Sequence, residues 1–362
     1  MTSHPSRVVR WLKRLTLILF LGIIVASAGA WWIYSQANQP FKGYDGAERF
    51  VDIPPGAGPV SIGQRLVDAG VVRDAWTFRA AILISGRARE LKAGEYRFDA
   101  PIDALAVIDK IRRGDVYRRL LTFREGLTIA EMAVVFEQKG FGAAAEFIKA
   151  AADAAAIRDL DPAARDLEGY VFPETYSLPR ATPAREVVAR MVSAFKDAFN
   201  EELRAAAAAE GLSVRQAVTL AALVEKETAA PDERPLVAAV YRNRMKLGMP
   251  MQADPTVIYA LQKAGRYNGN LTRDHLQFDS PYNTYRYPGL PPGPIASPGR
   301  ASLQAAVNPA PVDYVYFVSK NDGTHAFATT LEEHNRNVFT WQVEYFRNQR
   351  RAPGSGLPEP KR

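Results

Sequence analysis

A run of residues without a single charge, Leu15–Tyr34, is the feature that most constrains the fold of this chain. About 20 helical residues, each rising about 1.5 Å, span the ~30 Å hydrocarbon core of a bilayer. Residues 1–14 contain basic side chains and no acidic ones, and Trp31, Trp32 and Tyr34 stand at the far end of the run. This is the positive-inside pattern with an interfacial aromatic belt. The sequence therefore predicts a single-pass membrane helix at 15–34, preceded by a cytoplasmic basic segment at 1–14.

A cleaved signal peptide is the alternative interpretation of the same run. The apolar stretch is longer than the usual 7–15-residue core of a signal peptide. Small residues at 28–30 resemble a cleavage site, but the bulky Trp31 and Trp32 follow them directly. An uncleaved anchor is therefore favoured, with the bulk of the chain on the far side of the membrane.

The composition excludes several classes of function. With 362 residues, 47% of them hydrophobic, the chain has room for two or three domains with substantial cores. It contains no cysteine, and its four histidines lack the spacing of a zinc-binding helix. No glycine-rich phosphate loop or serine nucleophile elbow is present. We expect neither a metal nor a cofactor.

The formal charge of +7 lies at the two ends of the chain. Residues 1–14 and 347–362 each carry a net charge of +4, which leaves −1 for residues 15–346. A nucleic-acid-binding domain needs a basic face on the fold itself. Nucleic acid is therefore not an expected partner.

Hydrophobic periodicity predicts an α+β chain with the membrane helix, a small α+β module and a mostly helical domain. The predicted segments after the helix are a linker at 35–47, the module at 48–118, the helical domain at 119–349 and a disordered tail at 350–362. Within the helical domain we expect alanine-rich helices through 143–165 and 185–209, a β-hairpin at 313–329 and a long loop at 266–300.

Capping signals mark the starts of three helices in the larger domain. Thr128 with Glu131, and Ser213 with Gln216, have the spacing of capping boxes. Asp254 precedes a proline and is expected to be the N-cap of a third helix.

Two carboxylates, Glu225 and Glu227, end a helix that is apolar on nearly every side from 217 to 224. Loss of water disfavours a charged carboxylate, so an acid at this position is a candidate proton donor near neutral pH. A helix-end glutamate that pairs with an arginine or caps a loop N–H is the structural alternative. The two residues are about 200° apart around the helix and so point in different directions. Periodicity does not choose between them.

Polar and aromatic residues further along suggest a ligand-binding cleft. Gln252 lies just before the helix that starts near Asp254, and Tyr282–Tyr285 lies in the long loop. Tyrosine rings stack on sugars and amides bind hydroxyl groups, although a rigid loop packed on a core has the same composition.

A hydrolytic glycosidase needs a second carboxylate at a defined separation from the first. Glu174, Asp254 and Asp279 are candidates, and the sequence alone does not place them.

Five motifs, in order, closely resemble those of the endolytic murein transglycosylases, also called the MltG or YceG-like family. They are Leu167–Tyr176, Leu223–Thr228, Met251–Tyr259, Tyr282–Tyr285 and Gly289–Gly299. The resemblance extends from the membrane helix to the terminal helix. Glu174 stands where relatives often carry aspartate.

This resemblance implies an inner-membrane protein whose periplasmic part holds a LysM-like module at 48–118 and a catalytic domain at 119–349. It assigns the catalytic acid/base to Glu225, the first glutamate of the Glu-Lys-Glu-Thr motif, and a structural role to Glu227, which would bind a neighbouring backbone or basic group. Gln252, Asn283, Tyr285 and Glu174 become substrate-binding candidates.

The implied reaction cleaves the bond between N-acetylmuramic acid and N-acetylglucosamine and closes a 1,6-anhydro ring, which needs one carboxyl group. Peptidoglycan strands are then the substrate, and penicillin-binding proteins or other glycan synthases are the implied partners. A non-catalytic peptidoglycan-binding scaffold and a hydrolytic muramidase are the alternatives.

Overall fold

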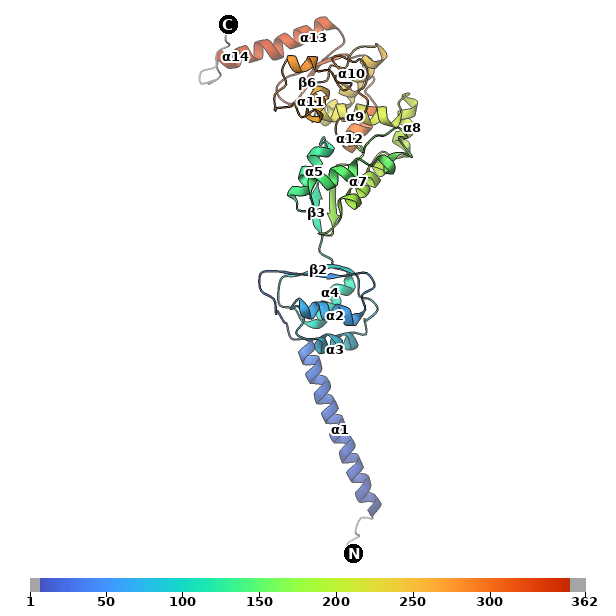
Figure 1. Cartoon of the computed structure of the whole chain (residues 1–362), viewed down its shortest axis with the longest axis vertical. Coiled ribbons are helices and arrows are strands. Elements are labelled where there is room, and N and C mark those ends of the chain that lie inside the picture. The colour runs from blue at the N-terminus through green and yellow to red at the C-terminus, as the bar shows by residue number, and fades with distance from the viewer. Residues whose placement is uncertain (1–6, 352–362) are drawn as a thin grey trace. The chain divides into compact units, whose positions relative to one another are not determined.

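The computed structural model describes residues 7–351 of the chain, whose backbone is about half helical and carries three two-stranded sheets among these residues. It contains two compact units (Figure 1). The first comprises the chain up to Arg119 together with Ser177–Arg180, and the second comprises Leu120–Tyr176 and the chain from Ala181 onward. Residues 1–6 of the predicted basic segment and 352–362 of the predicted tail lie outside the described residues.

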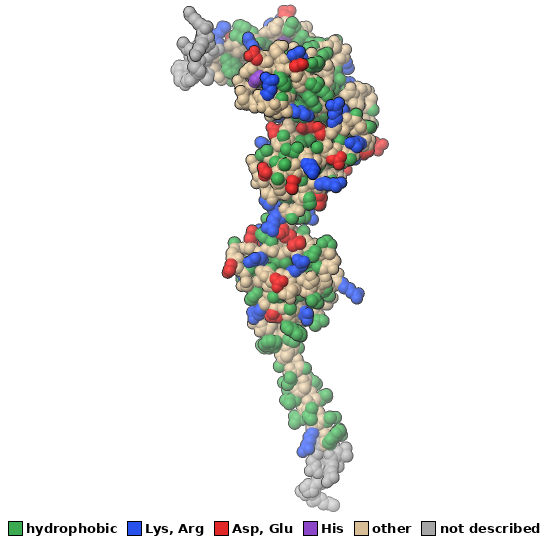
Figure 2. All heavy atoms as spheres, viewed as in Figure 1, with side chains coloured by type: hydrophobic (Ala, Val, Ile, Leu, Met, Phe, Trp, Pro, Cys, Tyr) green, Lys and Arg blue, Asp and Glu red, His purple; other side chains and the backbone are tan. Residues whose placement is uncertain are grey.

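The first unit begins with one long helix, α1, which runs from Arg7 to Ala37. The predicted boundaries at residues 14 and 34 are therefore not boundaries of the helix. Its stretch Arg14–Ala37 has a mean hydropathy of 2.1. Hydrophobic side chains along it are exposed (Figure 2), whereas Ala37 is buried in the core of the unit. The helix is long and apolar enough to cross a membrane, a test that a signal sequence also passes.

The rest of the first unit is a small α+β module. Its elements are β1 (Arg49–Ile53), α2 (Pro59–Asp68), α3 (Ala75–Ser85), β2 (Gly94–Phe98) and α4 (Ala104–Arg113). The strands β1 and β2 pair antiparallel, with Val51 opposite Tyr96. Buried residues from both strands and all three helices form one core.

The second unit is mostly helical. In chain order its elements are β3 (Arg119–Thr122), α5 (Ile129–Gln138), α6 (Ala144–Ala151), η1 (Ala154–Ile157), β4 (Thr175–Leu178), α7 (Ala184–Ala198), α8 (Glu201–Ala209), α9 (Val214–Glu227), η2 (Pro231–Glu233), α10 (Arg234–Lys246), α11 (Asp254–Lys263), η3 (Asp274–Gln277), α12 (Arg300–Val307), β5 (Tyr316–Ser319), β6 (His325–Ala328), α13 (Leu331–Val338), the π-helical η4 (Phe339–Glu344) and α14 (Tyr345–Arg351). Strand β3 pairs with β4, and the division between the units falls within these strands. Strands β5 and β6 form the predicted antiparallel hairpin.

Helix α9 lies at the centre of the second unit (Figure 1), in contact with α8, α10, α11 and α12. Every residue from Ala217 to Val224 is buried, as the apolar sequence predicts. Ser213 and Gln216 form the predicted capping box at its start, and Thr128 and Glu131 form the one at the start of α5.

Two helix predictions were wrong. The alanine-rich stretch expected to be helical through 165 ends its α-helix at Ala151, followed by the short 3₁₀ helix η1. The stretch 185–209 is two helices, because the side chain of Asn200 accepts a hydrogen bond from the backbone of Leu203 and caps α8. A local cap thus outweighs the helix propensity of alanine.

Candidate functional site

The two glutamates at the end of α9 enter different surroundings, as their separation around the helix predicts. Glu225 meets the start of α12 and the loop that leads into α5. Glu227 meets α10 and the start of α11. Which of the two is the better candidate proton donor therefore depends on the hydrogen-bond partners and charges that the neighbouring elements place around each carboxyl group.

Glu225 is bound by a backbone group. Its Oε2 accepts a hydrogen bond of 3.0 Å from the N–H of Gly299, the residue that precedes α12. This contact ties the end of α9 to the start of α12. A second acid, Glu125, is nearby: burial and the Glu225 carboxylate raise the pKa of Glu125, and Arg234 lowers it.

Glu227 lies in a desolvated position among other ionisable groups. Burial and, to a smaller extent, the Asp254 carboxylate raise its pKa to about 7. The Tyr241 hydroxyl and the Arg244 guanidinium partly oppose this shift. The sequence interpretation expected Glu227 to bind a backbone or basic group. Arg244 is such a neighbour, but the hydrogen bond from the backbone is made to Glu225 instead.

Asp254 was expected to cap α11, and this prediction was wrong. The capping position belongs to Ala253, and Asp254 is the first residue of the helix. Its Oδ1 instead accepts a hydrogen bond of 2.6 Å from the hydroxyl of Tyr285. Burial raises the pKa of Tyr285, and the hydrogen bond to Asp254 contributes to that shift. Glu227, Asp254 and Tyr285 therefore form one cluster, called here the Glu227 cluster.

Gln252 has a backbone conformation that a residue with a side chain rarely adopts. Its φ of 51° lies in the left-handed region, and its side chain is exposed. The Gln252 N–H donates to the carbonyl of Thr284, and the buried Arg244 donates to the carbonyls of Pro250 and Met251. Strained residues that their surroundings hold in place are concentrated at functional sites. This turn presents the Gln252 side chain to solvent two residues before Asp254.

Asn283 has no exposed surface. Its side-chain N–H groups donate to the carbonyls of Leu276 and Phe278, and its Oδ1 accepts from the N–H of Tyr285. This placement favours a role in shaping the loop over the predicted contact with substrate. The amide holds Tyr285 where its hydroxyl reaches Asp254.

Glu174 and Asp279, two of the candidates for a second carboxylate, lie elsewhere. Glu174 is exposed at the start of β4, where its carbonyl accepts from the N–H of Phe123. Asp279 accepts a hydrogen bond from the hydroxyl of Tyr287 at the surface. Asp254 and Glu125 are the carboxylates that the structure brings near Glu227 and Glu225, respectively. Sequence reasoning did not single out Glu125.

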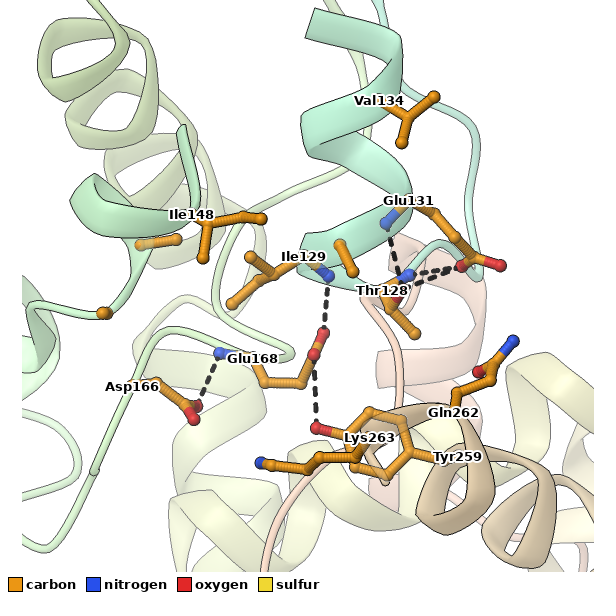
Figure 3. A pocket seen from close by; sticks show the side chains of 13 residues that line it. Thr128, Ile129, Glu131, Val134, Ile148, Asp166, Glu168, Tyr259, Gln262 and Lys263 are labelled. Atoms are coloured by element: carbon orange, nitrogen blue, oxygen red, sulfur yellow. Dashed lines mark hydrogen bonds between the residues drawn. The ribbon is translucent and has the colours of Figure 1, made fainter. Parts of the chain in front are cut away.

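Glu168 is a further buried acid that the sequence analysis did not single out. It is 8% exposed, and burial raises its pKa to about 8. Its carboxyl group accepts hydrogen bonds from the N–H of Ile129, at 3.1 Å, and from the hydroxyl of Tyr259, at 3.3 Å (Figure 3). A cavity of about 510 Å³ opens beside it. Its position within the aromatic-rich motif 167–176 was the available signal. Neither Glu225 nor Glu227 lines this cavity.

Within residues 7–351, no group of three or more histidine, aspartate or glutamate side chains is arranged to hold a metal ion.

Comparison with known proteins gives consistent matches. The model of the YceG-like family matches residues 51–340. A Bacillus subtilis (strain 168) protein named endolytic murein transglycosylase is 31% identical over 79% of this chain and 82% of its own length. A protein of the same name from Streptococcus pneumoniae serotype 2 (strain D39) is 29% identical over 90% of this chain, which spans 64% of that relative. A crystal structure of a yceG-like protein from Listeria monocytogenes shares 30% identity with a TM-score of 0.55, over 80% of this chain and 98% of that one.

Proposed function

Because the chain belongs to the YceG-like family, we propose that it is an endolytic murein transglycosylase that cleaves peptidoglycan strands internally. The names of the two curated relatives support this function. The observation that carries the mechanism is the Glu227 cluster, in which one carboxyl group has a pKa of about 7. Both protonation states of that group are well populated at neutral pH.

The reaction needs one group that acts as acid and then as base. Protonated Glu227 donates its proton to the glycosidic oxygen between N-acetylmuramic acid and N-acetylglucosamine, and the bond from that oxygen to C1 breaks. The C6 hydroxyl of the muramyl residue attacks C1, and the Glu227 carboxylate takes the hydroxyl proton. A 1,6-anhydro ring forms, the acid is regenerated and no water is consumed.

The raised pKa suits the first of these steps. A carboxyl group with a pKa of 4.5 is protonated in only ~0.3% of molecules at pH 7, whereas one with a pKa of about 7 is protonated in roughly half. Asp254 supports this protonation by its negative charge, and Tyr285 fixes the orientation of Asp254 through its hydrogen bond.

Glu225 remains the acid/base that the motif resemblance predicts, and the two residues are separable by experiment. Glu227 is favoured on electrostatic grounds, because burial and the Asp254 carboxylate raise its pKa to about 7. The hydrogen bond from the N–H of Gly299 to Glu225 instead holds the end of α9 against the start of α12.

Substrate binding is assigned to the surroundings of the cluster. The exposed side chain of Gln252 and the half-buried ring of Tyr285 are placed to contact the sugars, and Asn283 positions the loop that carries Tyr285. Glu174 directly precedes β4, where it would bind a more distant part of the glycan strand.

The chain organisation follows the same proposal. Helix α1 anchors the protein in the inner membrane with its N-terminus in the cytoplasm and the remainder in the periplasm. The module at 48–118 is LysM-like and binds peptidoglycan, and the region 119–349 is the catalytic domain. Glycan synthases such as penicillin-binding proteins are the proposed partners, since cleavage of new strands would limit their length.

Product analysis tests the function. Purified peptidoglycan strands are digested with the wild-type protein and with a variant in which both Glu225 and Glu227 are glutamine, and the new ends are identified by mass spectrometry. The expected products of the wild type end in 1,6-anhydro-muramic acid and arise from within the strand. Reducing muramic acid ends would instead support a hydrolytic muramidase, and binding without cleavage would support a scaffold.

A further inference from the structure

The cavity beside Glu168 has the properties of a ligand pocket. Its volume of about 510 Å³ lies within the usual range for such pockets. Much of its wall consists of alkyl side chains from α5, α6 and the residue that follows α6 (Figure 3), namely Ile129, Ala130, Val134, Ile148, Ala151 and Ala152. Val134 and Ile148 are 47% and 46% exposed, so hydrophobic surface continues outward from the cavity.

Polar groups converge on this apolar wall from the opposite side. The buried Glu168 lies within the cavity lining, and Gln262 and Lys263 of α11 are exposed at its edge. The Lys263 ammonium lies 5.6 Å from the ring centres of both Tyr259 and Tyr282. Its charge lowers the pKa of the nearby Glu168, but within residues 7–351 it forms no ion pair with an acidic side chain, and its exposed ammonium can be reached by an anionic ligand.

One helix connects this cavity to the Glu227 cluster. Helix α11 begins with Asp254, whose carboxylate influences Glu227, and ends with Lys263 at the cavity. Nine residue steps of about 1.5 Å place the two ends ~13 Å apart along the helix. A peptide of five residues reaches up to ~17 Å when extended. A short peptide attached to a sugar in the cluster is therefore long enough to reach the cavity.

We propose that this cavity binds the peptide stem that muramic acid residues carry, and that the enzyme thereby prefers strands with stems over strands without them. This inference rests on the proposed function. Small alanine side chains of the stem pack on the alkyl wall, a stem carboxylate pairs with Lys263, and Glu168 in its protonated form donates a hydrogen bond to a stem carbonyl. Each part of the stem thus meets a matching group.

The combination of groups distinguishes a peptide stem from other occupants. A glycan chain would place hydroxyl groups against the alkyl wall and leave the Lys263 charge unmatched. An acyl chain has no group that could form a hydrogen bond with Glu168. A short peptide with small side chains and free carboxylates satisfies the wall and both polar groups.

The test compares two substrates, glycan strands with intact stems and the same strands after an amidase has removed the stems. For the wild type we expect stem-bearing strands to be cleaved about tenfold faster in kcat/KM, the equivalent of about 1.4 kcal/mol. Ala152→Trp, at an exposed position in the cavity wall, and Lys263→Gln are each expected to bring this ratio towards one. Lys149→Gln removes an exposed lysine of α6 that does not line the cavity, and it should keep the wild-type ratio.

A binding measurement accompanies the kinetics. Calorimetric titration of the full-length protein with free stem peptide should show binding that Ala152→Trp and Lys263→Gln weaken and Lys149→Gln does not. If neither substrate is cleaved, the proposed function fails, and this titration alone decides whether the cavity takes the peptide. Equal cleavage of both substrates, an unchanged ratio in both cavity variants, or tighter binding of stem-free glycan than of peptide would each overturn the inference.

Discussion

Glu225 and Glu227 are two residues apart on one helix, yet their side chains have different neighbours. Glu225 accepts a hydrogen bond from the N–H of Gly299 at the start of α12. Glu227 is half-buried beside Asp254, and its pKa rises to about 7. The apolar helix that precedes both is the same, so it does not cause this difference. The partners come from α12 in one case and from α10 and α11 in the other.

This difference teaches that desolvation by a helix is only part of what makes a carboxyl group a proton donor. A neighbouring negative charge, such as that of Asp254 beside Glu227, also raises the pKa. Substitution of each glutamate tests which of the two is the acid/base. Substitution of a neighbour tests what sets the pKa of Glu227.

The largest expected effect is on catalysis by the two glutamine variants. Glu227→Gln should lower kcat by about 10³-fold, since a positioned acid/base contributes 10²–10⁴-fold. Glu225→Gln keeps a group that accepts the Gly299 N–H, so a loss of about tenfold or less is expected from a single weakened hydrogen bond. Initial rates of anhydro-end formation measure both.

Thermal unfolding of the two variants is the control, because a loss of fold would lower either rate without bearing on mechanism. If Glu225→Gln abolishes cleavage while Glu227→Gln retains it, the acid/base is Glu225 and the electrostatic argument for Glu227 is wrong.

Local sequence signals predicted the start of α9 and the burial of its apolar stretch. The capping box of Ser213 and Gln216 involves residues three apart, and burial follows from a stretch, 217–224, whose side chains are apolar except for Thr219. The surroundings of Glu225 and Glu227 depend on Gly299 and Asp254, which lie far along the chain. No periodicity in α9 contains that information.

Contacts between residues that are distant in the sequence also explain why the capping prediction at Asp254 was wrong and why Glu168 was not predicted. The sequence around Asp254 has the local features of a cap, but Tyr285, from a distant loop, takes its carboxylate. Glu168 is buried by α5 and by Tyr259 of α11, neither of which is adjacent in sequence. By contrast, the break at Asn200 has a local cause, because asparagine is a favoured N-cap residue and its side chain accepts from the N–H of Leu203.

The second largest effect concerns stability, and it tests whether Glu168 resembles Glu227 as a desolvated acid. Its folded-state pKa of about 8 lies above the ordinary value of 4.5. Between these values the folded state binds more protons than the unfolded state, so this contribution to stability is present at low pH and lost as pH rises from about 4.5 to about 8. Glu227 acts in the same direction up to about pH 7.

Unfolding of the full-length protein in detergent at pH 5 and pH 8 measures this loss, which we expect to be on the order of 3 kcal/mol at the higher pH. Glu168→Gln cannot ionise and should show a smaller difference between the two pH values. The exposed Glu174→Gln should behave as the wild type. An equal difference in wild type and Glu168→Gln would show that Glu168 is not the source.

A smaller effect is expected on the pH dependence of cleavage. The first step needs protonated Glu227, so activity should fall as pH rises through about 7. Asp254→Asn removes a negative charge that raises this pKa, and the fall should therefore move to lower pH. Profiles of kcat against pH for both proteins measure the shift. A midpoint that moves to higher pH, or does not move, would contradict the proposed coupling.

The smallest effect is expected from Tyr285→Phe, which leaves the ring and removes the hydroxyl that donates to Asp254. A hydrogen bond to a charged group contributes about 1.5–3 kcal/mol, and solvent access at this half-buried site places the expected loss near the lower end, about tenfold in kcat/KM. Because Asp254 then loses a fixed orientation and keeps its charge, the pH midpoint should change less than in Asp254→Asn. Tyr287→Phe, which removes the matching hydrogen bond to Asp279 at the surface, is the control and should cleave at the wild-type rate. Equal losses in the two tyrosine variants would mean that the Asp254–Tyr285 contact has no particular role. A loss of activity confined to Tyr285→Phe would show that the loop carrying Tyr285 contributes to the surroundings that distinguish Glu227 from Glu225.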